Sequence, residues 1–268
     1  HVVHIYLTPN RSAVSVNDDA LISTTFKELD DYDGTPAFFY LHFMSAHQAA
    51  LVSQEHVAFE PHSRRQSAPA LEMINSDDNG LIQLDRHIHN TIQVLEEKGF
   101  LDDALIVITA DHGQSLKKMN QDLFWHKRTT FMSEIRIPLV IVDTANDLFD
   151  TIELPLFANQ FDIAPTLIQQ LGLPVPGSWR GESILHRSRQ DIAFQQEDEF
   201  YSAIFSIDDV ILQLTYDQRR DLTALYDVTL GQNFPATLAV DPSRLREVVR
   251  SMNDFYRRRI EIDPMTLL

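Results

Sequence analysis

The sequence contains no cysteine among its 268 residues. This absence excludes disulfides, thiolate zinc sites, redox pairs and cysteine nucleophiles. Glycine is also scarce, with 8 residues, or about 3% against an average near 7%. No Gly-x-Gly occurs, and the pair with Walker spacing, Gly172 and Gly177, is followed by Ser178 rather than lysine. The dinucleotide fingerprint and the phosphate-binding P-loop are therefore both missing.

Positive charge and long apolar runs are lacking as well. The 22 Lys and Arg residues face 39 Asp and Glu residues, which gives a formal net charge of −17. This balance disfavours nucleic acids and anionic membrane surfaces as main partners. No apolar run is long enough to span a membrane. Residues 1–7 lack the charged start and the cleavage site of a signal peptide, so we expect none there.

Apolar runs typical of strands alternate with helical patterns, which predicts a layered α/β fold. We expect strands at 2–7, 37–43, 104–110 and 136–142, and helices at 18–29, 72–98 and 162–171. Beyond Arg187 the pattern changes to short strands (201–206, 210–216, 224–228) and a final helix at 242–258. We therefore predict an α/β domain at 1–186 and a smaller subdomain at 187–268. The polar stretch 48–70 predicts a long loop, the kind that borders binding sites.

The tripeptide Asp111-His112-Gly113 directly follows the apolar run ALIVITA. Ligands of open α/β sheets bind just beyond the carboxyl ends of strands. A carboxylate and an imidazole there can both bind a divalent cation, and glycine allows a sharp backbone turn behind them. The tripeptide alone is weak evidence, because an aspartate that ends a strand more often caps a helix or a turn.

Four further motifs accompany this tripeptide in a fixed order. They are His47 at the end of LHFMSAH, the segment Phe124-Trp125-His126-Lys127-x-Thr129-x-Phe131 leading to Arg136-x-Pro138, the helix start Asp162-Ile163-Ala164-Pro165-Thr166, and Leu225-Tyr226-Asp227. Together with Asp111-His112-Gly113 this ordered set resembles the sulfatase family of the alkaline phosphatase superfamily. The resemblance covers roughly residues 18–227.

The resemblance implies an alkaline-phosphatase-like α/β sandwich with a mixed, mostly parallel central sheet and a small C-terminal α+β subdomain. It implies that Asp111 and His112 bind a divalent cation, calcium first, with manganese and zinc as alternatives. It also implies that His47, His126 and Lys127 bind the ester group and take part in catalysis. The positions Arg136, Asp162, Thr166 and Tyr226 match family positions that are usually architectural.

The nucleophile of the sulfatase pattern is missing. The family carries it in Cys-x-Pro-x-Arg or Ser-x-Pro-x-Arg, and the nearest match here, Ser67-Ala68-Pro69-Ala70-Leu71, lacks the arginine. The sequence therefore looks like the C-terminal portion of a sulfatase-like domain. Two ligands rarely hold a hard cation tightly, since such sites take about six oxygen contacts. We expect this chain to be inactive or weakly active by itself.

Three functions remain open at this point. The first is a metal-dependent hydrolase of sulfate or phosphate esters, acting on a glycan or a small molecule. The second is a transferase of the phosphoethanolamine or phosphoglycerol type acting on envelope glycans or lipids, which His126 favours. The third is a degenerate binding domain without catalysis, which the missing nucleophile favours. The resemblance alone implies a periplasmic or extracellular location.

The other histidines have plainer interpretations. His87 and His89 lie two residues apart on an expected helix, so they point to different faces and are expected to be exposed. His42 is either a core histidine or a partner of a site residue. His56 and His62 lie in the long loop, where solvated positions are expected although either could border a substrate.

Overall fold

A computed structural model describes most of the chain: residues 4–6, 18, 22–23, 26, 29–47, 52–65, 67–116, 124–125, 130–146, 156–185, 192–236 and 240–257. The chain forms two compact units. The first unit comprises residues 1–104, 116–124 and 143–146, and the second comprises 105–115, 125–142 and 147–268. The domain boundary near residue 187 stays a prediction.

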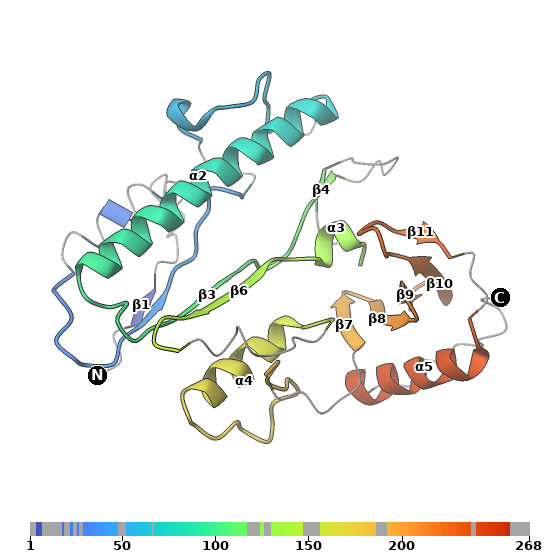
Figure 1. Ribbon diagram of the computed structural model, residues 1–268. Coiled ribbons are helices and arrows are strands. Elements are labelled where there is room, and N and C mark those ends of the chain that lie inside the picture. The colour runs from blue at the N-terminus through green and yellow to red at the C-terminus, as the bar shows by residue number, and fades with distance from the viewer. Residues whose placement is uncertain are drawn as a thin grey trace. The chain divides into compact units, whose positions relative to one another are not determined.

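The first unit combines a short parallel strand pair with a long helix (Figure 1). Strand β1 (His4–Tyr6) pairs in parallel with β2 (Phe38–Tyr40). A single 3-10 turn, η2 (Gln54–His56), interrupts the loop between β2 and the helix α2 (Ala70–Glu97). Gly99 follows the helix with a φ of 78°, a left-handed conformation that glycine adopts without strain. The predicted strands and long helix are confirmed, with β2 shorter than expected.

The buried stripe of α2 is mostly polar, which the sequence pattern did not predict. Ile82, one of several apolar residues at helical spacing in this segment, is 38% exposed. The buried positions, which follow helical spacing, are instead Met73, Asn75, Ser76, Asn79, Gly80, Gln83, His87, Thr91 and Leu95. Their amides bind the backbone of the preceding loop: Asn79 accepts from the N–H groups of Ala58 and Phe59, each at 2.9 Å. A loop without ladder partners needs such side chains to satisfy its backbone groups.

A strand pair at the start of the second unit carries the Asp111 motif. Strand β3 (Leu105–Thr109) pairs with β6 (Leu139–Asp143). The two strands run in opposite directions, because Ala104 bonds to Thr144 (2.9 Å) while Thr109 bonds to Pro138 (2.9 Å). Full burial of β3 was expected, but its side chains are half-buried or exposed, since within the described residues this strand pairs with β6 alone.

Short elements connect these two strands. Strand β4 (Ser115–Leu116) pairs with β5 (Phe124–Trp125), and the one-turn helix α3 (Met132–Ile135) follows. The strand expected at 136–142 begins only at Leu139, because the helix α3 occupies the residues up to Ile135. Pro138 lacks an N–H and therefore cannot donate to a strand ladder.

Helix α4 (Gln160–Gln170) begins at a capping box two residues before the predicted start. The N-cap Asn159 donates its backbone N–H to Asp162 (3.0 Å), and Asp162 also accepts from the backbone N–H of Glu182 (3.0 Å). A Cβ at Gly181 would lie 1.8 Å from the carbonyl oxygen of Phe161. Only glycine therefore allows the segment after the helix to return so close to the helix start.

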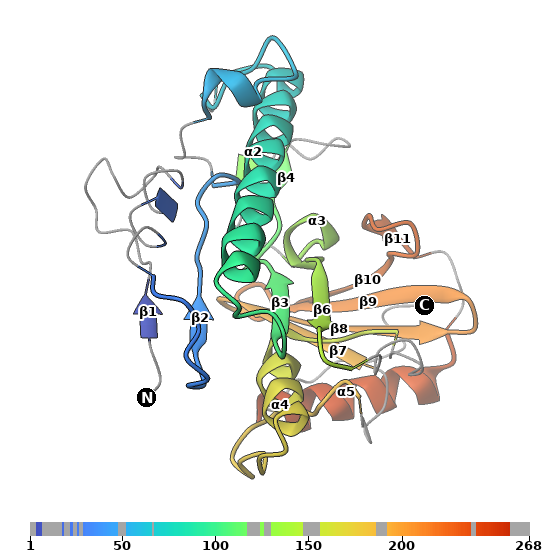
Figure 2. The same cartoon turned by 60° about the vertical axis from the view of Figure 1, so that its left-hand side comes forward.

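A five-stranded antiparallel sheet covered by a helix completes the second unit (Figure 2). Its strands are β7 (Ile192–Glu197), β8 (Phe200–Ile207), β9 (Val210–Asp217), β10 (Leu222–Asp227) and β11 (Phe234–Pro235), in the spatial order β11-β10-β9-β8-β7. Helix α5 (Pro242–Tyr256) packs against β8. The side chains of Phe205, Leu212, Leu214, Leu245 and Met252 are fully buried between them. Strands β7 and β11 were not predicted.

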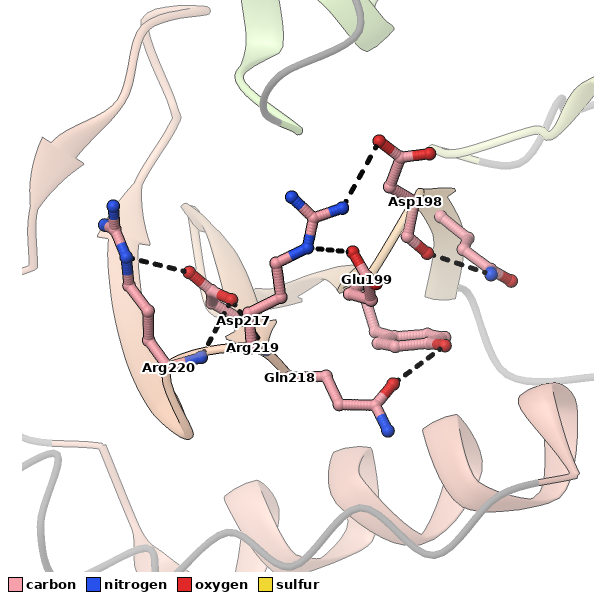
Figure 3. Close-up of polar contacts among 8 residues, drawn as sticks. Asp198, Glu199, Asp217, Gln218, Arg219 and Arg220 are labelled. Atoms are coloured by element: carbon pink, nitrogen blue, oxygen red, sulfur yellow. Dashed lines mark hydrogen bonds and ion pairs between the residues drawn. The ribbon is translucent and has the colours of Figure 1, made fainter.

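Charged side chains form ion pairs within and between the turns of this sheet (Figure 3). Arg219 in the β9–β10 turn pairs with both Glu199 and Asp198 in the β7–β8 turn, the latter at 3.8 Å. Arg220 pairs with Asp217, also at 3.8 Å. Because the Arg219 side chain is 61% exposed, these pairs contribute little to stability. The cluster holds three carboxylates against two guanidinium groups, so it carries a net negative charge and is not an anion site.

The overall architecture is mixed α/β, as predicted, and the C-terminal α+β arrangement of strands and helix is present. Among the described helices, none combines the length and the apolar character that crossing a membrane would require.

Candidate active site

Asp111 and His112 form a turn directly beyond the end of β3. The Asp111 carboxylate accepts the backbone N–H of His112 at 2.9 Å, and its side chain is 71% exposed. The His112 ring nitrogen Nδ1 lies 2.7 Å from the carbonyl oxygen of Gly113. A carbonyl can only accept, so Nδ1 carries the proton. In the neutral ring the lone pair is therefore on Nε2.

The unprotonated ring nitrogen of His112 lies close to the Asp111 carboxylate. His112 Nε2 and Asp111 Oδ2 are 3.6 Å apart. Two ligands at right angles around an ion with bond lengths of 2.3–2.6 Å would be about 3.3–3.7 Å apart. Ligating histidines also commonly donate their second ring N–H to a backbone carbonyl, as His112 does. The separation of the pair is therefore within the range expected for two neighbouring ligands of one cation.

The backbone of this turn contacts α3. Gly113 donates its N–H to the carbonyl of Glu134 at 2.7 Å, and a Cβ at Gly113 would meet the carbonyl oxygen of Ser133 at 2.3 Å. Ser115 donates its hydroxyl to the buried Glu134 carboxylate at 2.9 Å. Close backbone contact thus requires glycine in the third position of the motif.

The side chain of Gln160 also binds the backbone of the turn. Its Nε2 donates to the carbonyl oxygens of Ala110 and Asp111, each at 2.8 Å. Sequence reasoning did not single out this residue. The only signal was the start of helix α4, which the capping box of Asn159 and Asp162 marks, and that signal says nothing of a contact 49 residues away.

His47 lies in the first unit, in a segment that is fixed onto α2. The buried Asp18 carboxylate accepts the backbone N–H groups of Met44 (2.9 Å) and Ser45 (2.7 Å). A Cβ at Gly80 would meet the carbonyl oxygen of Ser45 at 2.6 Å, so glycine allows the segment to lie directly on the helix. The His47 side chain itself is exposed.

Arg64 binds the carbonyl groups of the same segment. Its guanidinium donates to the backbone carbonyls of Ser45 (3.3 Å) and His47. Burial lowers the pKa of Arg64, and the charge of Asp77 opposes this shift. The guanidinium remains charged at any physiological pH, because arginine starts from so high a pKa. The backbone at and just before His47 is therefore bound by the charged side chains of Asp18 and Arg64.

His126 and Lys127 lie outside the described residues, but the segment that follows them is well anchored. The hydroxyls of Thr130 and Ser202 share a hydrogen bond of 2.6 Å, and Gln213 donates to the Thr130 carbonyl. Phe131 packs edge-on against Tyr226, with the ring centroids 6.0 Å apart. The C-terminal sheet therefore fixes the chain just after the expected ester-binding lysine.

One expectation about the other histidines is wrong, and one of two open alternatives is removed. His87 is 1% exposed, not solvated, because it lies on the polar buried stripe of α2 and its ring is near those of Phe43 and His56. His42 is exposed, which removes the core alternative. His62 and His89 are exposed, as expected for solvated positions, and His56 is partly buried.

Two of the four architectural positions connect helix α4 with the segment after it. Asp162 is fully buried and accepts three N–H bonds, from the backbone and side chain of Asn159 and from Glu182. Thr166 donates to the Asp162 carbonyl at 2.6 Å and accepts from the backbone N–H of Ile184 at 3.1 Å. Both residues thus connect the start of α4 with the segment that follows the helix.

A comparison with protein families decides the assignment. The family model described as Sulfatase matches residues 4–173. The chain belongs to the sulfatase family. Its solved relatives include the PsFucS1 sulfatase from Pseudoalteromonas sp., with a TM-score of 0.56 at 16% identity, over 92% of this chain and 55% of that chain. The alkaline-phosphatase-like fold predicted for this sulfatase-family chain is thereby confirmed.

Curated relatives of this sulfatase-family chain match over shorter stretches. It is 32% identical over 108 residues to the multifunctional alkaline phosphatase superfamily protein PehA of Trinickia caryophylli, covering 40% of this chain and 20% of that protein. It is 24% identical over 118 residues to arylsulfatase K of Bos taurus, covering 44% and 21% respectively. The chain thus spans about a fifth of the length of these curated relatives.

The sulfatase family implies a divalent cation, and the Asp111 turn fits one in part. The tautomer of His112 and the 3.6 Å separation suit two neighbouring ligands. Within the described stretches of the chain, no group of three or more His, Asp or Glu residues could hold a metal ion. The oxygen spacing suits calcium, whereas an imidazole ligand suits zinc and similar metals. The donor types of the pair therefore do not distinguish between these ions.

Proposed function

We propose that this sulfatase-family chain is part of a divalent-cation-dependent hydrolase of sulfate esters, in which Asp111 and His112 bind the cation. One observation carries the proposal: Asp111 Oδ2 and the unprotonated Nε2 of His112 lie 3.6 Å apart in a turn that follows a strand of the sulfatase fold. The proposed ion is calcium, with manganese and zinc as alternatives.

The remaining site residues would act on the ester group. When bound, the cation would polarise the ester oxygens and so favour attack on the sulfur atom, or on the phosphorus atom of a phosphate ester. Lys127 would bind the anionic oxygens, and His47 and His126 would donate hydrogen bonds where negative charge accumulates. One of these histidines would protonate the leaving alcohol. These roles rest on the match of their positions to the sulfatase motifs.

This chain carries only part of the sulfatase pattern. The sequence holds no cysteine and no Ser-x-Pro-x-Arg, so it does not contain the family nucleophile motif. The chain spans 55% of the PsFucS1 structure. We therefore propose ester turnover for the whole protein, and cation and ester binding for this chain. The proposed substrates are sulfated, or alternatively phosphorylated, glycans or small-molecule esters, and the proposed location is periplasmic or extracellular, on family membership.

Ester binding by this chain is directly testable. In the presence of saturating calcium or manganese, Lys127→Gln is expected to weaken the binding of 4-nitrophenyl sulfate by about 10- to 100-fold. The reason is that a hydrogen bond to a charged group contributes about 1.5–3 kcal/mol. Titration calorimetry measures the affinity.

The matched control is Arg86→Gln, which removes one positive charge from an exposed position of α2. It is expected to bind the ester as the unmodified chain does. Equal weakening by both variants would show a non-specific charge effect and count against the proposal. Tighter binding of 4-nitrophenyl phosphate than of the sulfate would move the substrate class to phosphate esters.

A further inference from the structure

Gln160 bridges two successive carbonyl groups at the point where β3 ends. Its Nε2 lies 2.8 Å from the carbonyl oxygen of Ala110 and 2.8 Å from that of Asp111. Both partners can only accept, so the amide must present its NH₂ group to them, and its two protons match the two acceptors. The contact joins residues 49 and 50 positions apart in the sequence.

Holding these two carbonyls fixes the direction of the Asp111 side chain. The two bonded oxygens belong to the peptide planes on either side of the Asp111 Cα atom. With both planes held, the backbone dihedral angles of Asp111 are restricted, and so is the bond from its Cα to its Cβ. A carboxylate that is 71% exposed has few other contacts to set its direction.

The base of the Gln160 side chain is itself rigid. Gln160 is the first residue of α4, whose start is locked by the reciprocal bonds of Asn159 and Asp162. Asp162 is fully buried and also binds Glu182. The turn is therefore bound by two helices, by α4 through Gln160 and by α3 through the bond between Gly113 and Glu134 (2.7 Å).

We propose that Gln160 is a positioning residue for the Asp111–His112 cation ligands. This inference rests on the proposed function, in which that pair binds a divalent cation. Gln160 acts through backbone carbonyls and has no contact of its own with the cation in this assignment. Groups that orient metal ligands from behind typically change metal affinity 10- to 100-fold when they are removed.

The test uses the whole chain and the variant Gln160→Met, which keeps the length of the side chain and removes both N–H donors. Gln169→Met on the same helix is the matched control, because Gln169 is exposed and makes no contact with the turn. Two quantities are measured: the affinity for Mn²⁺ by titration, and the ¹⁵N chemical shifts of the His112 ring at a pH where the imidazole is neutral.

The expected result is at least a 10-fold loss of Mn²⁺ affinity in Gln160→Met, with the affinity unchanged in Gln169→Met. The metal-free ring shifts should also move from a single Nδ1–H tautomer toward a mixture, because the turn that brings Gly113 O to Nδ1 is loosened. Ring shifts that stay unchanged in Gln160→Met would overturn the inference, whatever the metal does.

The ring measurement keeps the two proposals separate. If the unmodified chain binds no Mn²⁺, Ca²⁺ or Zn²⁺ while Gln160→Met still alters the His112 tautomer, the positioning role stands and the cation proposal fails. If Mn²⁺ affinity is unchanged in Gln160→Met although the unmodified chain binds the ion, Gln160 has no influence on the ligands and the inference fails.

Discussion

Asp162→Ala is expected to lower the free energy of unfolding of the second unit by about 4 kcal/mol. The variant removes the acceptor of three N–H donors at a position with no solvent exposure. Each hydrogen bond to a charged acceptor contributes about 1.5–3 kcal/mol, and a buried donor left without a partner adds a desolvation cost. Such a loss is a large part of the 5–15 kcal/mol by which domains of this kind are stable. Urea unfolding followed by circular dichroism measures it.

The control for this variant is Gln169→Ala, an exposed position on the same helix that is expected to change stability by less than about 0.5 kcal/mol. An Asp162→Ala chain that unfolds at the same urea concentration as this control would show that the buried carboxylate does not hold α4 and the segment at Glu182 together.

Gly113→Ala is expected to disrupt the cation-ligand turn and to destabilise the second unit by about 2 kcal/mol. The added Cβ would lie 2.3 Å from the carbonyl oxygen of Ser133, closer than any real contact of this kind. The turn must therefore move away from α3 and lose the bond from Gly113 to Glu134 (2.7 Å). Overpacking of this sort typically costs about 1–3 kcal/mol.

Gly177→Ala is the matched control for the glycine variant, because nothing lies within 4 Å of its added Cβ. It is expected to leave stability unchanged or to raise it by up to about 1 kcal/mol, since alanine restricts the unfolded chain. Both variants are measured by thermal unfolding, without and with Mn²⁺. A Gly113→Ala chain that keeps both its midpoint and its response to Mn²⁺ would show that the turn does not depend on α3.

Local signals in the sequence were sufficient for the long helix and for several strands, and they pointed to Asp111 and His112 as the proposed cation ligands. The 3.6-residue periodicity predicted α2 within two residues of its observed start. The apolar run before Asp111 predicted β3, and this placed Asp111 and His112 just beyond a strand end. Family motifs connected these residues to the sulfatase pattern. Strand chemistry and helix periodicity are properties of neighbouring residues, so they can be read without a structure.

Contacts between distant residues could not be predicted in this way. Nothing near Gln160 indicates that its amide meets the carbonyl of Asp111, 49 residues away. The burial of His87 had no local signal either, because the inward face of α2 is defined by the loop it must bind and not by apolar residues. His126 and Lys127 lie outside the described residues, so their roles stay predictions.

The most direct test of the cation site is thermal unfolding of the unmodified chain, Asp111→Asn and Asp102→Asn, with and without Ca²⁺, Mn²⁺ or Zn²⁺. Asp102 is an exposed carboxylate in a turn, so its variant controls for the loss of one negative charge. At about 100 times its dissociation constant, the correct ion should stabilise the chain by about 2.7 kcal/mol. We expect that gain in the unmodified chain and in Asp102→Asn, and its loss in Asp111→Asn. An equal gain in all three proteins, or none in any of them, would contradict a cation site at Asp111 and His112.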